Sequence, residues 1–268
     1  MRKYIIAIVI IVFMLFNQTF VYSEVEGSDQ PIKIDSLKSG LVKAQYNTGR
    51  SKSLKFMVEK DGVRYTYDLN NSNNYESFPL QLGNGEYKLS ILENIEGIKY
   101  KYLITREIYV NEDVNSVFLN SIQMIRWDKD SAAIKKAKEL TAGIKSDNEK
   151  IEILRNYIVN NITYDYVKAA NLNPGYLPDN DKTLKDGKGI CYDFASLYAA
   201  MLRSQGIPTK LAMGYTDGVS EYHAWNEVYD NSTGEWRLID TTYDSVLKNT
   251  KKADIYKDKS KYKKDREY

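Results

Sequence analysis

Apolar and polar residues alternate along the chain after residue 30, which is the pattern of β-strands with one buried face. Leu54, Phe56 and Val58 fall on one side of such a strand, and the tight-turn dipeptide Asp61-Gly62 follows. The alternation and the turn dipeptides recur downstream with no helical period between them. We therefore expect an all-β domain over residues 30–115, a small sandwich for which the immunoglobulin-like fold is one candidate.

The spacing of apolar positions changes to that of helices after Trp127. Residues 131–144 are rich in Ala and Lys and predict a helix. Ser146, with Glu149 three positions later, forms a capping-box pattern, and apolar residues then recur at helical spacing. We expect this second helix to end near Ile162.

A third helix follows a segment rich in turn-forming residues. Residues 171–189, with several Pro and Gly, predict an irregular loop. From Phe194 onward apolar residues recur along one helix face until Gly206, so Cys191 lies at or just before the first turn. Three strands are then expected, over residues 210–215, 223–229 and 234–240. The pattern predicts a second, α+β domain over residues 125–247.

The first residues have the layout of a secretory signal peptide. Arg2 and Lys3 precede the apolar run Ile5–Phe16, and Ser23 suits cleavage after it. The run is too short to span a bilayer comfortably, so an uncleaved anchor is the less favoured alternative. We expect residues 1–23 to be removed and the protein to be secreted or held at the cell surface.

Composition and charge narrow the classes of partner. The chain has 268 residues, 43% of them hydrophobic, which suits a protein with a buried core. Its formal charge of +2 falls to zero without Arg2 and Lys3. Residues 248–268 hold nine Lys/Arg against four Asp/Glu, a basic tail that would make at most weak contact with an anionic surface. No phosphate-binding loop, dinucleotide fingerprint or nucleic-acid motif occurs, so neither a cofactor nor a nucleic-acid partner is predicted.

The chain contains a single cysteine, Cys191, and a single histidine, His223. One cysteine cannot form an internal disulfide in an exported protein, so the thiol needs another explanation. At the start of a helix, free backbone N–H groups and the helix dipole favour negative charge, which suits a thiolate nucleophile. His223 is then the natural base.

The hairpin that carries His223 also offers an acid. If a four-residue loop occupies residues 230–233, His223 faces Asp240 and Trp225 faces Leu238 across two antiparallel strands. The carboxylate would then orient the imidazole, and the helix of Cys191 would pack over this face. A nucleophile, a base and an orienting acid are the groups that acyl transfer requires.

Each of these residues also has a structural interpretation. A lone cysteine or histidine is often part of a core, and an aspartate often ends a strand. Cys191, His223 and Asp240 could instead hold a zinc ion, although no further Cys or His is present to close a structural site. Their joint occurrence favours catalysis, and no metal is predicted.

Three segments resemble the motifs of the transglutaminase-like superfamily: GICYDFASLYAAMLRSQGIPTKLAMGY, HAWNEVY and WRLIDTTYD. The resemblance spans residues 130–245, and the three motifs occur in the order and spacing of the family. It implies a papain-like catalytic core in which Cys191 is the nucleophile, His223 the base and Asp240 the orienting acid.

The resemblance also suggests supporting residues. Asp193 matches an acidic residue common two places after the cysteine and is expected to have a structural role. The backbone N–H of Cys191 would be one oxyanion donor, with Tyr164 or Tyr166 as a candidate for the second. Trp225 is expected to support His223 on the same sheet face. Such domains continue beyond the acid, whereas this chain becomes Lys-rich, so the last strand is expected to be missing or weak.

These observations predict an exported enzyme that transfers acyl groups from peptide, protein or cell-wall peptide amide bonds through a thioester. Water as acceptor makes it a protease or amidase, which we favour, and an amine makes it a cross-linking transglutaminase. No calcium dependence is implied. The alternative is a catalytically inactive surface or binding module with the same fold.

Overall fold

A computed structural model of the chain describes residues 30–34, 37–113, 115–248 and 254–268. The predicted signal peptide, residues 1–23, lies outside the described residues. Within them, no helix combines the length and the apolar character needed to cross a bilayer.

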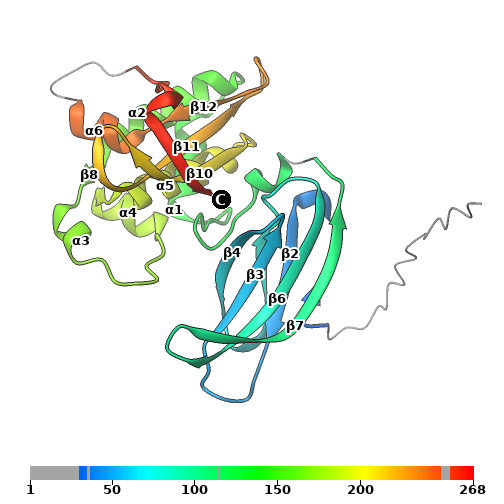
Figure 1. The fold of residues 1–268 in the computed structure, drawn as a ribbon. Coiled ribbons are helices and arrows are strands. Elements are labelled where there is room, and N and C mark those ends of the chain that lie inside the picture. The colour runs from blue at the N-terminus through cyan, green and yellow to red at the C-terminus, as the bar shows by residue number, and fades with distance from the viewer. Residues whose placement is uncertain (1–29, 35–36, 114, 249–253) are drawn as a thin grey trace, which may run out of the picture. The chain divides into compact units, whose positions relative to one another are not determined.

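The first part of the chain is all-β, as predicted (Figure 1). A three-stranded sheet has the order β1-β2-β5 and a four-stranded sheet the order β4-β3-β6-β7, both antiparallel. The strands are β1 (Ile32–Lys33), β2 (Leu41–Tyr46), β3 (Leu54–Lys60), β4 (Val63–Leu69), β5 (Ser72–Pro79), β6 (Gly85–Glu96) and β7 (Lys99–Val110), with the 3-10 helix η1 (Leu37–Ser39) before β2.

The two sheets pack face to face as a sandwich. Phe56 of β3 stacks on Phe78 of β5 with ring centroids 4.5 Å apart. Asp61 and Gly62 both have positive φ and close the β3–β4 hairpin, the turn that their dipeptide predicts. The strand order differs from that of a constant-type immunoglobulin domain. Here the fourth strand pairs with the third, whereas in the constant type it pairs with the fifth.

The second part is α+β, which confirms the predicted fold class. Its antiparallel sheet has the order β12-β11-β10-β13. The strands are β8 (Thr163–Tyr164), β9 (Lys188–Gly189), β10 (Thr209–Thr216), β11 (Val219–Asp230), β12 (Glu235–Ile239) and β13 (Tyr262–Glu267). The helices are η2 (Ser116–Leu119), α1 (Ala132–Leu140), α2 (Asp147–Asn161), α3 (Tyr166–Ala170), α4 (Asn180–Asp186), α5 (Cys191–Arg203), α6 (Thr241–Leu247) and η3 (Lys259–Lys261).

Helix α5 is central to this part because it contacts β10 and β11 as well as α1 and α2 (Figure 1). Its residues are buried almost throughout, with Phe194, Leu197 and Met201 fully enclosed. Helix α2 starts as predicted, since the Ser146 hydroxyl accepts the N–H of Glu149 at 3.3 Å. A thoroughly packed α5 gives its first residue a fixed position.

The predicted irregular loop over residues 171–189 is wrong in part, because α4 forms inside it. Asp179 caps α4 by accepting the N–H of Lys182 at 2.9 Å, and Gly187 ends it with φ 64°. These are ordinary start and stop signals. The helix is too short to show a clear apolar period, and the neighbouring Pro and Gly residues favoured the prediction of a loop.

The expectation of a missing or weak last strand is also wrong. Strand β13 pairs with β10, from Ala212 opposite Glu267 to Thr216 opposite Tyr262. Charged side chains of this strand have partners in the sheet, and Lys264, for example, bonds Glu227 at 2.7 Å. An edge strand can consist of charged residues because only part of its surface is buried.

Candidate functional site

Cys191 is the first residue of α5 and is partly exposed. The turn before it is held by Asp193, whose carboxylate accepts the N–H of Ile190 at 2.8 Å. Gly189 is needed here because a Cβ at this position would lie 2.7 Å from the Cβ of Asp193. The helix start therefore presents the thiol from a closely packed turn, and its free N–H groups favour a negative charge there.

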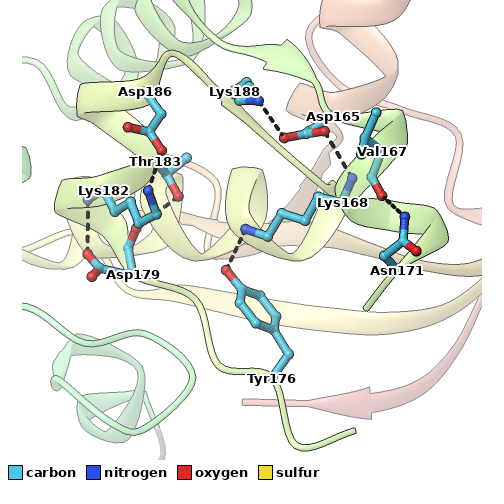
Figure 2. A pocket seen from close by; sticks show the side chains of 10 residues that line it. All are labelled: Asp165, Val167, Lys168, Asn171, Tyr176, Asp179, Lys182, Thr183, Asp186 and Lys188. Atoms are coloured by element: carbon cyan, nitrogen blue, oxygen red, sulfur yellow. Dashed lines mark hydrogen bonds and ion pairs between the residues drawn. The ribbon is translucent and has the colours of Figure 1, made fainter. Parts of the chain in front are cut away.

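Asp193 also ties α5 to the preceding segment. Its fully buried carboxylate accepts bonds from Lys168 at 2.6 Å and from Tyr176 at 2.5 Å. Figure 2 shows Lys168 extending from α3 toward the Tyr176 hydroxyl, which it bonds at 2.6 Å. These contacts support the structural role predicted for Asp193, because they join the loop and α3 to the start of α5.

His223 and Asp240 form a buried pair. The imidazole Nε2 lies 2.8 Å from a carboxylate oxygen of Asp240, with the two side chains 4% and 1% exposed. Because Nε2 faces the acid, Nδ1 is the nitrogen left for the thiol. The Asp240 carboxylate thus orients the ring, as a catalytic base requires.

The strand register that led to this pair is wrong by two residues. Tyr229 pairs with Trp236 rather than with Gly234, so the turn of the hairpin lies one residue later than predicted. A shift by two keeps every side chain on its face of the sheet. His223 and Asp240 are therefore diagonal neighbours rather than directly opposed, and still within hydrogen-bond distance.

The carboxylate of Asp240 accepts two further hydrogen bonds. One of its oxygens accepts the N–H of Tyr243 at 2.9 Å, which makes Asp240 the cap of α6. The oxygen that faces His223 also accepts the hydroxyl of Tyr262 at 3.0 Å. Tyr262 belongs to β13, the segment expected to be a basic tail, and no sequence signal distinguished it among the surrounding lysines.

The imidazole of His223 is biased toward its protonated form. Burial lowers its pKa, but hydrogen bonds with Asp240 and with Cys191 outweigh burial and raise the pKa to about 10. The ring is therefore an imidazolium at neutral pH. The acid and the thiol thus act on the same ring.

Trp225, the residue expected to support His223, packs beside the imidazole ring. It is buried, lies 6.3 Å from the His223 ring at an interplanar angle of 24°, and contacts Tyr262 edge to face at 5.1 Å. It limits the movement of the imidazole through packing, and no described residue hydrogen-bonds its indole N–H.

A cleft of about 530 Å³ opens onto Cys191 and His223. The structure brings both tyrosine candidates to it. Tyr164 is partly buried there, and burial first and the neighbouring Cys191 second raise its pKa to about 12, so its hydroxyl keeps its proton. Tyr166 is 69% exposed at the edge of the cleft. The pairing of β8 with β9 sets Tyr164 opposite Gly189, directly before the Cys191 turn.

A second hollow, of about 500 Å³, borders the same helix α3 (Figure 2). Its carboxylates are engaged internally, since Asp186 bonds Lys182 at 2.6 Å and Asp165 bonds Lys188 at 3.2 Å. Helix α3 contributes residues both to this hollow and to the cleft of Cys191. The hollow holds paired charges and lacks a nucleophile, so the cleft is the candidate site.

Residues 134–241 match the family model of the transglutaminase-like superfamily, which confirms the resemblance for this part of the chain. The chain is 34% identical over 103 residues to the UPF0252 protein MJ1282 of Methanocaldococcus jannaschii, an alignment that covers 34% of this chain and 29% of that protein. The chain thus spans less than a third of that relative.

Two solved structures share parts of the fold. A candidate cysteine protease from Cytophaga hutchinsonii is 16% identical, with a TM-score of 0.43 and coverage of 75% of this chain and 74% of that one. The periplasmic domain of TgpA from Pseudomonas aeruginosa is 16% identical, with a TM-score of 0.39 and coverage of 75% and 91% respectively.

Proposed function

We propose that this protein is an exported thiol-dependent enzyme that transfers acyl groups from peptide amide bonds. The observation that carries the proposal is the buried His223–Asp240 pair, whose imidazole lines the same cleft as Cys191. Cys191 is the nucleophile, His223 its acid–base partner, and Asp240 the residue that orients the ring. Export rests on the predicted signal peptide.

The reaction follows from this arrangement. Because the ring of His223 already carries its proton, Cys191 reacts as the thiolate, and the sulfur attacks the amide carbon to give a tetrahedral oxyanion. The imidazolium then donates its proton to the leaving amine, which departs and leaves a thioester on Cys191. An acceptor that gives its own proton to the now neutral His223 attacks the thioester, which restores the imidazolium and releases the sulfur of Cys191 as the thiolate.

The oxyanion needs hydrogen-bond donors. The backbone N–H of Cys191 lies at the free start of α5, and the hydroxyl of Tyr164 lines the same cleft and keeps its proton. Tyr164 therefore suits the second donor better than the exposed Tyr166 does.

Hydrolysis is the favoured outcome. Several cleft-lining residues, including Tyr166, Glu221 and Tyr222, are exposed, so water can reach a thioester on Cys191. The protein would thus act as a protease or amidase on peptide, protein or cell-wall peptide substrates, with a primary amine as the competing acceptor.

The test is mass spectrometry of a peptide library incubated with the wild type and with Cys191→Ala, with and without a primary amine. We expect cleavage products only from the wild type, and amine-coupled products as a minority when amine is present. Equal product from both proteins would contradict the proposal. A thiol probe that labels the wild type and leaves Cys191→Ala unlabelled is the control for an accessible thiol.

A further inference from the structure

The cleft that contains Cys191 and His223 has an unequal distribution of charge. Four tyrosine side chains and several small or aliphatic residues make up most of its lining. Glu221 is the one carboxylate among the lining residues, and no lysine or arginine is among them. A group bound next to the thiol therefore meets apolar and aromatic walls, the His223 imidazolium, whose charge is paired with Asp240, and the single carboxylate of Glu221.

The Glu221 carboxylate lacks an ion-pair partner within the described part of the chain. It is exposed, and no described lysine or arginine forms an ion pair with it. Glu227, farther along the same strand, differs in pairing with Lys264 at 2.7 Å. A carboxylate left unpaired beside a catalytic cleft is available to a substrate.

The strand geometry explains how Glu221 comes to line the cleft. Glu221, Tyr222 and His223 are consecutive in β11, yet all three line the cleft. A regular strand would turn neighbouring side chains to opposite faces. The pairing of β10 with β11 shifts register between Gly214 and Thr216, and such irregularities re-aim side chains near active sites.

We propose that Glu221 determines specificity and that the peptide bound in this cleft carries a cationic side chain, lysine or arginine, near the attacked carbonyl. This inference rests on the proposed acyl-transfer function. The carboxylate attracts the cationic end of the side chain, tyrosine faces favour cations as well, and the alkyl stem packs on the aliphatic walls. The cation belongs to the acyl donor, because a carboxylate stabilises an ammonium in its protonated form, which cannot attack the thioester.

The first test uses the fact that Cys191 is the only cysteine in the chain. Two methanethiosulfonate reagents, one with a trimethylammonium group and one with a sulfonate group, each form a mixed disulfide with the thiol and release methanesulfinate. The rate of each reagent with Cys191 is divided by the rate of the same reagent with a small free thiol, so that differences in intrinsic reactivity cancel. We expect the ratio of cationic to anionic rates to fall by about fivefold or more in Glu221→Gln, the effect of one nearby charge.

Glu221→Lys should lower the ratio further. Glu96→Gln, which removes an exposed glutamate of β6 in the N-terminal sandwich, should leave it unchanged. An unchanged ratio in both Glu221 variants would overturn the proposal. This labelling needs no catalytic turnover, so its result stands even if the protein cleaves no peptide, an outcome that would overturn only the proposed function.

The second test compares peptide substrates that differ at one position, with arginine, lysine, norleucine or glutamate near the cleaved bond. We expect kcat/KM to be about tenfold higher for arginine and lysine than for norleucine, and this preference to disappear in Glu221→Gln. Arginine cannot serve as an acyl acceptor, so its preference assigns the cation to the donor. Equal turnover of arginine and norleucine peptides, or a preference for lysine alone as the coupled amine, would overturn the proposal.

Discussion

Tyr164 and Tyr166 show how two similar residues two positions apart acquire different environments. Both line the cleft, with their rings 4.8 Å apart in an edge-to-face contact. Tyr164 is partly buried beside Cys191, whereas Tyr166 is 69% exposed. The hydroxyl of Tyr164 is the better placed donor to an oxyanion, because water competes with it less than with the exposed hydroxyl of Tyr166.

Replacing these tyrosines by phenylalanine gives a matched comparison. We expect Tyr164→Phe to lower kcat about 100-fold with little change in KM, because an oxyanion donor acts mainly in the transition state. Tyr166→Phe should stay within about twofold of the wild type, since its exposed hydroxyl competes with water. Steady-state kinetics with a cleaved peptide is the measurement, and equal losses in the two variants would assign the second oxyanion donor elsewhere.

His223 provides its own probe because it is the only histidine. We expect its ring signals in NMR to titrate with a midpoint near pH 10, well above the usual 6.5. Because the folded pKa is the higher one, the stability gained from this group is complete below pH 6.5 and is lost as pH rises through 10. Asp240→Asn should lower the midpoint by removing the paired charge.

Asp61→Asn is the control for this titration, because its turn position tolerates asparagine and lies outside the cleft. The raised pKa of His223 also predicts that amide cleavage declines above pH 10, when the imidazolium is lost. Alkylation of the thiol by a neutral reagent should continue at that pH. A wild-type midpoint near 6.5 would show that the interactions with Asp240 and Cys191 do no more than offset the effect of burial.

At the scale of elements, the start of α5 depends on close packing between Gly189 and the side chain of Asp193. Gly189 ends β9, and the side chain of Asp193 occupies the space where a Cβ would lie. The same carboxylate bonds Ile190, Lys168 and Tyr176. The position of Cys191 is thus set by packing of the segment before α5 as well as by α5 itself.

Gly189→Ala should therefore disturb both stability and the thiol. We expect a loss of about 1–3 kcal/mol in the free energy of unfolding, as overpacking of a tight site causes. We also expect an altered rate of Cys191 alkylation by iodoacetamide. Gly218→Ala is the control for stability, because its Cβ would meet the Tyr243 ring at an ordinary contact distance of 3.4 Å. Wild-type behaviour of Gly189→Ala in both measurements would contradict this packing argument.

Local elements were predictable where their signals are local. The Asp61-Gly62 turn, the Ser146 cap and the helix that begins at Cys191 all depend on residues within a few positions of one another. Helix α4 was missed because its few residues lie between loop-forming ones. The hairpin register was wrong by two because the position of the turn, not the face pattern, fixes it.

At the scale of the whole molecule, Arg203 joins three segments that are distant in sequence. Its guanidinium donates to the carbonyls of Thr209 at 2.8 Å, Asn120 at 2.6 Å and Tyr268 at 2.8 Å. The side chain is buried, and burial lowers its pKa to about 9. Tyr268 directly follows β13, so the bond from Arg203 to Tyr268 helps to fix that strand. Strand β13 in turn carries Tyr262, whose hydroxyl donates a hydrogen bond to Asp240.

Arg203→Met should be strongly destabilising, because it leaves buried carbonyls without their donors. We expect a loss of about 3 kcal/mol or more in the free energy of unfolding, read from the urea midpoint at unchanged slope. Arg126→Met, at an exposed position, should change it by less than about 0.5 kcal/mol. Equal midpoints for the two variants would show that Arg203 contributes no net stability.

The sequence by itself determined the alternating strands, the helix start at Cys191 and the three residues proposed to act together, because each rests on local periodicity or on motif spacing. Only the tertiary structure decided that Tyr262 bonds Asp240, that β13 completes the sheet and that Glu221 lines the cleft. These features arise from contacts between segments far apart in the chain. Such contacts depend on register and packing, which leave no signature in the order of the residues.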